Sequence, residues 1–148
     1  AFQAAVRRGV SVQITTNCVE NTDCCIAQAA YLTQRRKLVG NKMALWEYQG
    51  PNMLHSKSWV VDNIVVIGSY NLDPRAAIFD TQSCVLVYCP ELADALVRVM
   101  QNERNAFAVP IGRDAIRFTN CLQQGVRSRR AITTSVLRGV APLVWFQL

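Results

Sequence analysis

The stretch LHSKSWVVDNIVVIGSYNLDPR, residues 54–75, decides the fold. Two runs rich in β-branched residues, SKSWVV and IVVIGS, stand on either side of Asp62-Asn63. Extended runs around a short polar turn of this composition are typical of a β-hairpin. We therefore expect two strands that meet at Asp62-Asn63.

His55, the only histidine among the 148 residues, opens this stretch. Because side chains alternate along a strand, His55, Lys57 and Trp59 are expected on one face. A neutral imidazole beside a fixed ammonium can act as nucleophile or proton donor toward an anion that the lysine holds. The alternative interpretation is a lone histidine that fills a partly buried site.

Phosphorus chemistry suits this pairing. The transition state of phosphoryl transfer spreads negative charge over its oxygens, and Lys57, Ser69 and Asn71 carry donors of the kind that stabilise such charge without a metal. These residues are the predicted catalytic group together with His55.

The remaining chain alternates predicted helices and strands. Helices are expected at 1–8, from Thr22 or Asp23 to about Leu38, and at 90–108, and further strands at 10–16, 43–48 and 82–89. Residues 73–81 are expected to be a loop. This alternation predicts an α/β fold with a mixed β-sheet flanked by helices.

The net charge of +6 comes entirely from the last third of the chain. Through Leu96 eight Lys and Arg balance eight Asp and Glu, whereas eight arginines face two acids from Val97 onward. We expect residues 1–108 to form one catalytic unit and residues 109–148 a basic C-terminal tail. The tail suits an anionic membrane surface or a nucleic-acid backbone, and a solvated basic face is the third alternative.

Six cysteines, at 18, 24, 25, 84, 89 and 121, lack the spacing of a zinc site. We expect no metal ligands among them and no cofactor, but reduced thiols in a cytosolic compartment. Apolar runs are too short for a spanning helix, which needs about 20 residues. The predicted location is therefore cytoplasmic, with peripheral attachment to membranes.

The spacing His55-x-Lys57-x4-Asp62, followed by Gly68-Ser69-x-Asn71, resembles the signature of the phospholipase D superfamily. The runs RRGVSVQITTN, NTD, ALWEY, NLDPRA and PELADAL resemble its cardiolipin-synthase-like branch, specifically the C-terminal half, over residues 1–100. The resemblance implies one half of a phospholipase D-like α-β-α sandwich.

The resemblance also implies a mechanism built from two such motifs. One histidine attacks phosphorus to form a phosphohistidine, and the other protonates the leaving alcohol and then activates the acceptor. With a single histidine, this chain needs a second motif, from an upstream half or from a homodimer partner. In this scheme His55 is assigned the acid/base role.

Two departures from the family pattern bear on activity. Five residues separate Asp62 from Gly68, where the family has six. With a two-residue turn, Ser69 and Asn71 are expected to point away from His55 and Lys57, so we predict a three-residue turn or a β-bulge if the protein is active. A regular ladder from Val61 and Ile64 back to His55 and Tyr70 would count against catalysis. Asp62 is expected to organise that turn.

The second departure concerns the residues expected to orient the histidine. Gln82 replaces the family's glutamate, and Asp80 replaces its asparagine. Two further residues are predicted to contact substrate. Arg75 is assigned to a lipid phosphate or a structural salt bridge, and Trp59 to the pocket wall or the core.

The leading functional hypothesis is a phospholipase D or cardiolipin-synthase-like phosphatidyltransferase that acts on phospholipid. A metal-independent nuclease of the same superfamily is the main alternative, because the same residues cleave nucleic-acid phosphodiesters. A catalytically weakened homologue, or a degenerate interaction module that retains only the sheet, also fits the two departures.

Overall fold

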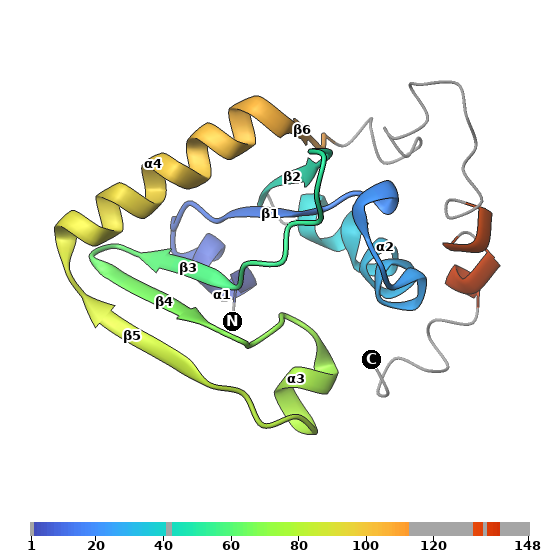
Figure 1. The fold of residues 1–148 in the computed structure, drawn as a ribbon, viewed down its shortest axis with the longest axis horizontal. Coiled ribbons are helices and arrows are strands. Elements are labelled where there is room, and N and C mark those ends of the chain that lie inside the picture. Colours follow the sequence, from blue (N-terminus) through green and yellow to red (C-terminus); the bar gives the residue numbers. More distant parts are fainter. Residues whose placement is uncertain (1, 41–42, 113–131, 135, 140–148) are drawn as a thin grey trace.

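The computed structural model describes residues 2–40, 43–112, 132–134 and 136–139. Figure 1 shows the order of the elements along the chain. They are α1 (Phe2–Arg7), β1 (Gln13–Asn17), a 3-10 turn η1 (Val19–Asn21), α2 (Cys25–Gly40), β2 (Ala44–Tyr48), β3 (Ser58–Val61), β4 (Ile64–Gly68), α3 (Pro74–Ile78), β5 (Cys84–Tyr88), α4 (Pro90–Phe107) and β6 (Ala108–Pro110).

The described strands form two three-stranded sheets. In the first, β2 lies between β1, which it pairs in parallel, and β6, which it pairs antiparallel. The second is antiparallel, in the order β3-β4-β5. The predicted α/β class, with mixed strand directions and flanking helices, is confirmed, and the strands are divided between two sheets.

The hairpin forms around Asp62-Asn63 as the sequence predicts. Val61 pairs with Ile64, and the register continues without interruption to Ser58 and Ile67. Asp62 adopts a φ of 52°, a left-handed conformation that short hairpin turns favour and that aspartate tolerates. The predicted three-residue turn or β-bulge is therefore wrong, because a two-residue turn closes this ladder with every pair in register.

The hydrophobic core lies between α2 and the first sheet. Val39, Leu45 and Ile111 are its buried centre, and Ile14 and Leu38 pack against them. Ile111, which belongs to this buried centre, follows directly after β6. Burying these side chains stabilises the layer of α2 against β2 by about 1.5–3 kcal/mol each.

A buried ion pair ties α2 to β2. Arg35 Nε lies 2.8 Å from Glu47 Oε1, and the Tyr31 hydroxyl donates to the same oxygen across 2.9 Å. Burial raises the pKa of Glu47, and the positive charge of Arg35 partly offsets that effect. Because both charged side chains are more than nine-tenths buried, each depends on the other to avoid an uncompensated charge.

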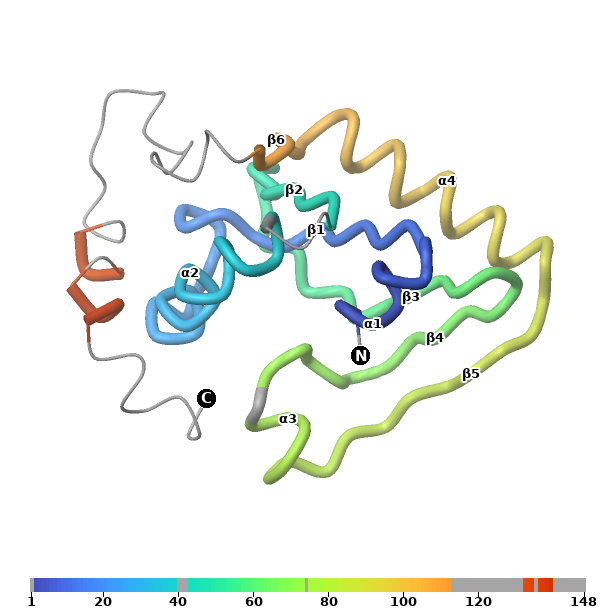
Figure 2. Tube along the Cα trace, turned by 180° about the vertical axis from the view of Figure 1, so that it is seen from behind, coloured from blue at the N-terminus to red at the C-terminus, as the bar shows by residue number. Residues whose placement is uncertain are grey.

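Helix α4 connects the two sheets. Figure 2, seen from behind, shows it running from the end of β5 to β6, and it contacts strands of both sheets. Near its C-terminus Arg104 lies over the ring of Trp46, 4.3 Å from the centroid, and donates to the side chain of Gln13. The helix therefore fixes where the hairpin stands relative to β1 and β2.

The segment 73–81, expected to be a loop, contains helix α3. Asp73 accepts a hydrogen bond from the Ala76 N–H across 2.7 Å, and Pro74 occupies the first helical position. An Asp-Pro pair suits a helix start as well as a turn, which is why the sequence interpretation was wrong here.

Most of the predicted basic tail lies outside the described residues. Residues 132–134 and 136–139 are helical. None of the described helices is both long and apolar enough to cross a membrane.

Candidate active site

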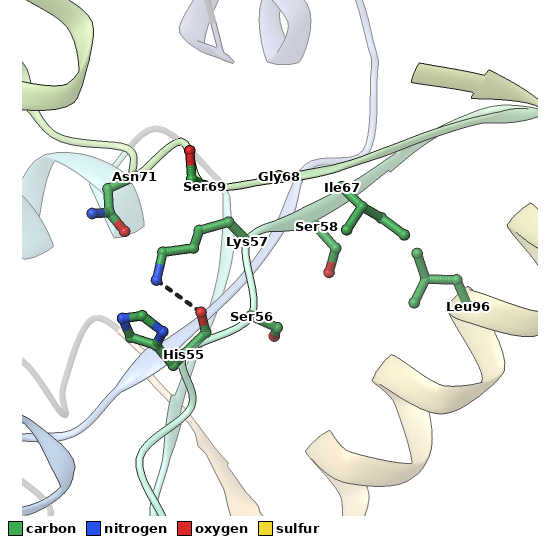
Figure 3. Close-up of a pocket in the computed structure, with 9 residues that line it drawn as sticks. All are labelled: His55, Ser56, Lys57, Ser58, Ile67, Gly68, Ser69, Asn71 and Leu96. Carbon is green, nitrogen blue, oxygen red and sulfur yellow. Dashed lines mark hydrogen bonds between the residues drawn. The ribbon is translucent and has the colours of Figure 1, made fainter. Parts of the chain in front are cut away.

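An open hollow of about 610 Å³ lies where β3 and β4 end. Figure 3 shows its lining, which combines four of the predicted catalytic residues with neighbours from β3, β4 and α4. The lining residues are His55, Ser56, Lys57, Ser58, Ile67, Gly68, Ser69, Asn71 and Leu96.

His55 and Lys57 lie on the irregular segment that leads into β3. Lys57 Nζ donates to the backbone carbonyl of His55 across 2.8 Å. Burial lowers the pKa of Lys57, and the negative charge of Asp23 partly offsets that effect. The ammonium therefore stands beside the imidazole at the rim of the hollow, and it can exchange a neutral carbonyl for an anionic oxygen.

Asn71 reaches the same group because the hairpin ladder ends before the motif does. The Gly68 N–H still donates to the Lys57 carbonyl, and the Ser69 N–H donates to the Ser83 carbonyl as the β4–β5 register requires, but β4 ends at Gly68 and the chain bends at Ser69. In Figure 3, Asn71 lies on the same side of the hollow as His55 and Lys57. A strand end, rather than a bulge, brings together the residues that a continued ladder would separate.

Ser69 is turned toward β5. Its hydroxyl donates to Gln82 Oε1 across 2.5 Å and accepts from the Ser83 N–H across 3.1 Å. Figure 3 shows this hydroxyl directed away from His55 and Lys57. In this arrangement Gln82 holds Ser69 rather than the imidazole.

Asp80 also has another partner than the histidine. Its carboxylate lies 3.2 Å from Arg75 Nε; the Arg75 side chain is 61% exposed and that of Asp80 is 35% exposed. This is the structural salt bridge that the sequence left open for Arg75. Neither Gln82 nor Asp80 forms a hydrogen bond to His55 among the described residues, so their histidine-orienting role stays a prediction. The substrate contact of Arg75 also stays a prediction.

Trp59 and Asp62 lie apart from the lining of the hollow. The Trp59 ring packs edge-on against Tyr70, with centroids 5.7 Å apart, and Asp62 sits exposed in the hairpin turn. Trp59 therefore stabilises the strand ends next to the site. Asp62 lies in the turn with a φ of 52°, and its role in organising that turn stays a prediction.

Sequence reasoning missed three features of the site. Leu96 of α4 and Ile67 supply an apolar wall, and Gly68 leaves no room for a side chain because a Cβ there would collide with the Ser83 carbonyl and with Cys84. The glycine was visible in the motif, but its steric reason depends on β5. The approach of Leu96 depends on how α4 packs, which local patterns do not reveal.

Comparison with known proteins places this arrangement in a family. Residues 1–104 match the family described as cardiolipin synthase, PLD-like domain, where PLD stands for phospholipase D. The chain belongs to that family. The His-x-Lys motif and the hollow both lie within the matched residues of this PLD-like domain.

Two curated relatives each match part of the chain. The PLD-like domain is 28% identical over 120 residues to cardiolipin synthase C of Escherichia coli K12. This match covers 68% of this chain and 25% of the relative. It is also 29% identical over 106 residues to an uncharacterised protein of Helicobacter pylori 26695, and that match covers 62% of this chain and 21% of the relative. The chain thus spans about a quarter or less of these relatives.

Two solved structures share the fold. Nuc of Salmonella typhimurium, a phospholipase D family member, superimposes with a TM-score of 0.59 at 26% identity, over 74% of this chain and 70% of Nuc. A phosphatidylserine synthase of Haemophilus influenzae gives a TM-score of 0.67 at 16% identity, over 99% of this chain and 37% of that one. At 16% identity, the second likeness shows a shared fold and nothing about activity.

Proposed function

We propose that this domain supplies one of the two motifs of a phosphodiesterase or phosphatidyltransferase that acts on phospholipid. The observation that carries the proposal is the gathering of His55, Lys57 and Asn71 on one side of a single hollow. Family membership and the likeness to cardiolipin synthase C support the lipid substrate.

In the first step a second histidine, from outside these 148 residues, attacks phosphorus and forms an N–P bond. The P–O bond to the leaving alcohol breaks, and His55 donates the proton that this oxygen requires. Lys57 and Asn71 stabilise the negative charge on the phosphoryl oxygens. In the second step His55 takes a proton from water or an acceptor alcohol, which attacks phosphorus while the N–P bond breaks.

The second histidine comes either from an upstream half of the same protein or from a second copy. Both sources place two imidazoles on opposite sides of one phosphorus, which in-line displacement requires. A paired site of this kind on an anionic membrane surface would meet its substrate without a spanning helix. The proposal therefore includes peripheral attachment to the membrane.

Substrate class is tested with the protein expressed from its complete reading frame, in EDTA. Vesicles with labelled phosphatidylglycerol are compared with labelled single-stranded DNA at equal phosphodiester concentration. We expect phosphatidic acid or cardiolipin from the vesicles and little cleavage of DNA. Cleavage of DNA alone would replace the lipid proposal with the nuclease alternative, and absence of both products would favour a weakened homologue.

A further inference from the structure

The segment that carries His55 has little regular structure of its own. Residues 49–57 contain no helix or strand, although they connect β2 to β3 and hold the imidazole at the hollow. A segment of this kind keeps a fixed position only if other groups satisfy its backbone. Two asparagines do this, one at the end of β1 and one at the end of η1.

Asn17, the last residue of β1, binds the backbone of Leu54 at both of its polar atoms. Its Nδ2 donates to the Leu54 carbonyl, and its Oδ1 accepts from the Leu54 N–H, both across 2.8 Å. The carboxamide thus imitates a neighbouring strand, although the two residues are 37 positions apart in the sequence. His55 follows Leu54 directly, so this pair fixes the peptide from which the imidazole projects.

Asn21 holds the beginning of the same segment. Its Nδ2 donates to the carbonyls of Gly50, across 2.5 Å, and Asn52, across 3.2 Å. The buried side chain of Gln28, on α2, donates to the Asn17 carbonyl across 3.2 Å and so anchors the strand end that carries the first asparagine. A continuous path of hydrogen bonds leads from α2 to the residue before His55.

We propose that Asn17 is a positioning residue for the reaction, with Asn21 in a supporting role. This inference rests on the proposed function, because it assigns Asn17 the task of holding His55 at the distance from Lys57 that the chemistry needs. Asn17 acts through the Leu54 backbone and does not line the hollow itself. A displacement of about 1 Å at a reacting group can cost about 100-fold in rate. The two hydrogen bonds between Asn17 and Leu54, here called the clamp, therefore control turnover more than substrate binding.

The single histidine allows a test that does not depend on activity. In the 148-residue chain labelled with 15N-histidine, the imidazole of His55 gives one set of signals. Asn17→Leu removes both hydrogen bonds at similar volume, and Asn17→Asp removes only the donor. Asn102→Asp, at an exposed position of α4, is the matched control for the added charge.

We expect both Asn17 variants to shift or broaden the His55 signals, and Asn17→Leu to speed amide exchange at Leu54 by about 10-fold or more. Asn102→Asp should leave both unchanged. Unaltered His55 signals and Leu54 exchange in folded Asn17→Leu would overturn the proposal. If Asn17→Leu does not fold, Asn17→Asp and Asn21→Ala provide the same readouts.

Kinetics of the complete protein then separate positioning from general stability. We expect kcat to fall about 10- to 100-fold in Asn17→Leu while KM changes little. A loss of activity that only follows the unfolded fraction would contradict the proposal. His55→Ala tests the proposed function separately: if that variant stays active while Asn17→Leu displaces the His55 signals, the chemistry is wrong and the clamp stands.

Discussion

Lys57 donates a hydrogen bond from Nζ to the backbone carbonyl of His55, two residues earlier, across 2.8 Å. The bond holds the ammonium beside the histidine backbone. An anionic oxygen is a stronger acceptor than a neutral carbonyl, so a phosphate that enters the hollow competes favourably for the same ammonium. Phosphate binding therefore requires only that the Lys57 ammonium exchange one acceptor for another.

This pair predicts how anion binding depends on pH. Binding of inorganic phosphate needs the charged Lys57 ammonium, and burial lowers the pKa of that group. As pH rises, phosphate affinity should therefore begin to fall at a lower pH than it would with a fully exposed lysine. Titrations followed by the His55 imidazole signals between pH 7 and 10.5 measure this.

Lys57→Ala should abolish the phosphate response, and Lys57→Arg should keep part of it without the loss at high pH, because arginine stays protonated. In turnover we expect Lys57→Ala to cost about 100- to 1,000-fold. A phosphate affinity that does not change between wild type and Lys57→Ala would remove Lys57 from the site.

The contact between Ser69 and Gln82 predicts a coupling that a double-mutant cycle can measure. Ser69→Ala and Gln82→Ala each remove the same 2.5 Å hydrogen bond. Their combined effect on the free energy of unfolding should be smaller than the sum by about 0.5–1 kcal/mol, measured by urea denaturation. Strict additivity would show that Gln82 has a different partner in solution.

Gly68→Ala should disturb the site through the backbone. A Cβ at this position would collide with the Ser83 carbonyl and with Cys84, so β4 and β5 must move apart beside Ser69. We expect a loss of about 1–3 kcal/mol in unfolding free energy and a larger loss in turnover. Gly112→Ala is the matched control, because a Cβ there meets nothing within 4 Å, and its stability should stay close to wild type.

Removing Glu47 should destabilise the fold strongly. Glu47→Ala leaves Arg35 buried without its partner, which costs about 3–5 kcal/mol in comparable buried pairs. Urea denaturation measures this against Glu103→Ala at an exposed position of α4, where little change is expected. A cost below 1 kcal/mol for Glu47→Ala would mean that water reaches the pair.

The same carboxyl predicts a pH dependence of stability. Because burial raises the pKa of Glu47, the folded state binds more protons than the unfolded state above pH 4.5, its ordinary value. The contribution of Glu47 to stability therefore falls as pH rises from that value to the raised one. Glu47→Gln should lack this slope.

The sequence predicts the parts of the fold that local patterns determine. Runs of β-branched residues around Asp62-Asn63 are enough to place the hairpin, and the spacing of apolar residues after Pro90 is enough to place α4. The division into two sheets depends on pairing between distant strands, such as Gln13 with Ala44, which no local pattern specifies.

The site shows the same limit. Counting residues from the turn predicted that Asn71 would face away from His55 unless a bulge intervened, but the count assumes that the ladder continues. β3 begins at Ser58 and β4 ends at Gly68, and the chain bends at Ser69, a position that no local pattern in the sequence specifies. Asn17 escaped notice for a similar reason, since its partner Leu54 lies 37 residues away.

The most direct test of the central claim is the turnover of labelled phosphatidylglycerol by His55→Gln in the complete protein, in EDTA. Asn105→Gln, at an exposed position of α4, is the control. The account predicts that His55→Gln stays folded and loses turnover by about 100- to 10,000-fold, while the control keeps wild-type turnover. Wild-type turnover by a folded His55→Gln protein would contradict it.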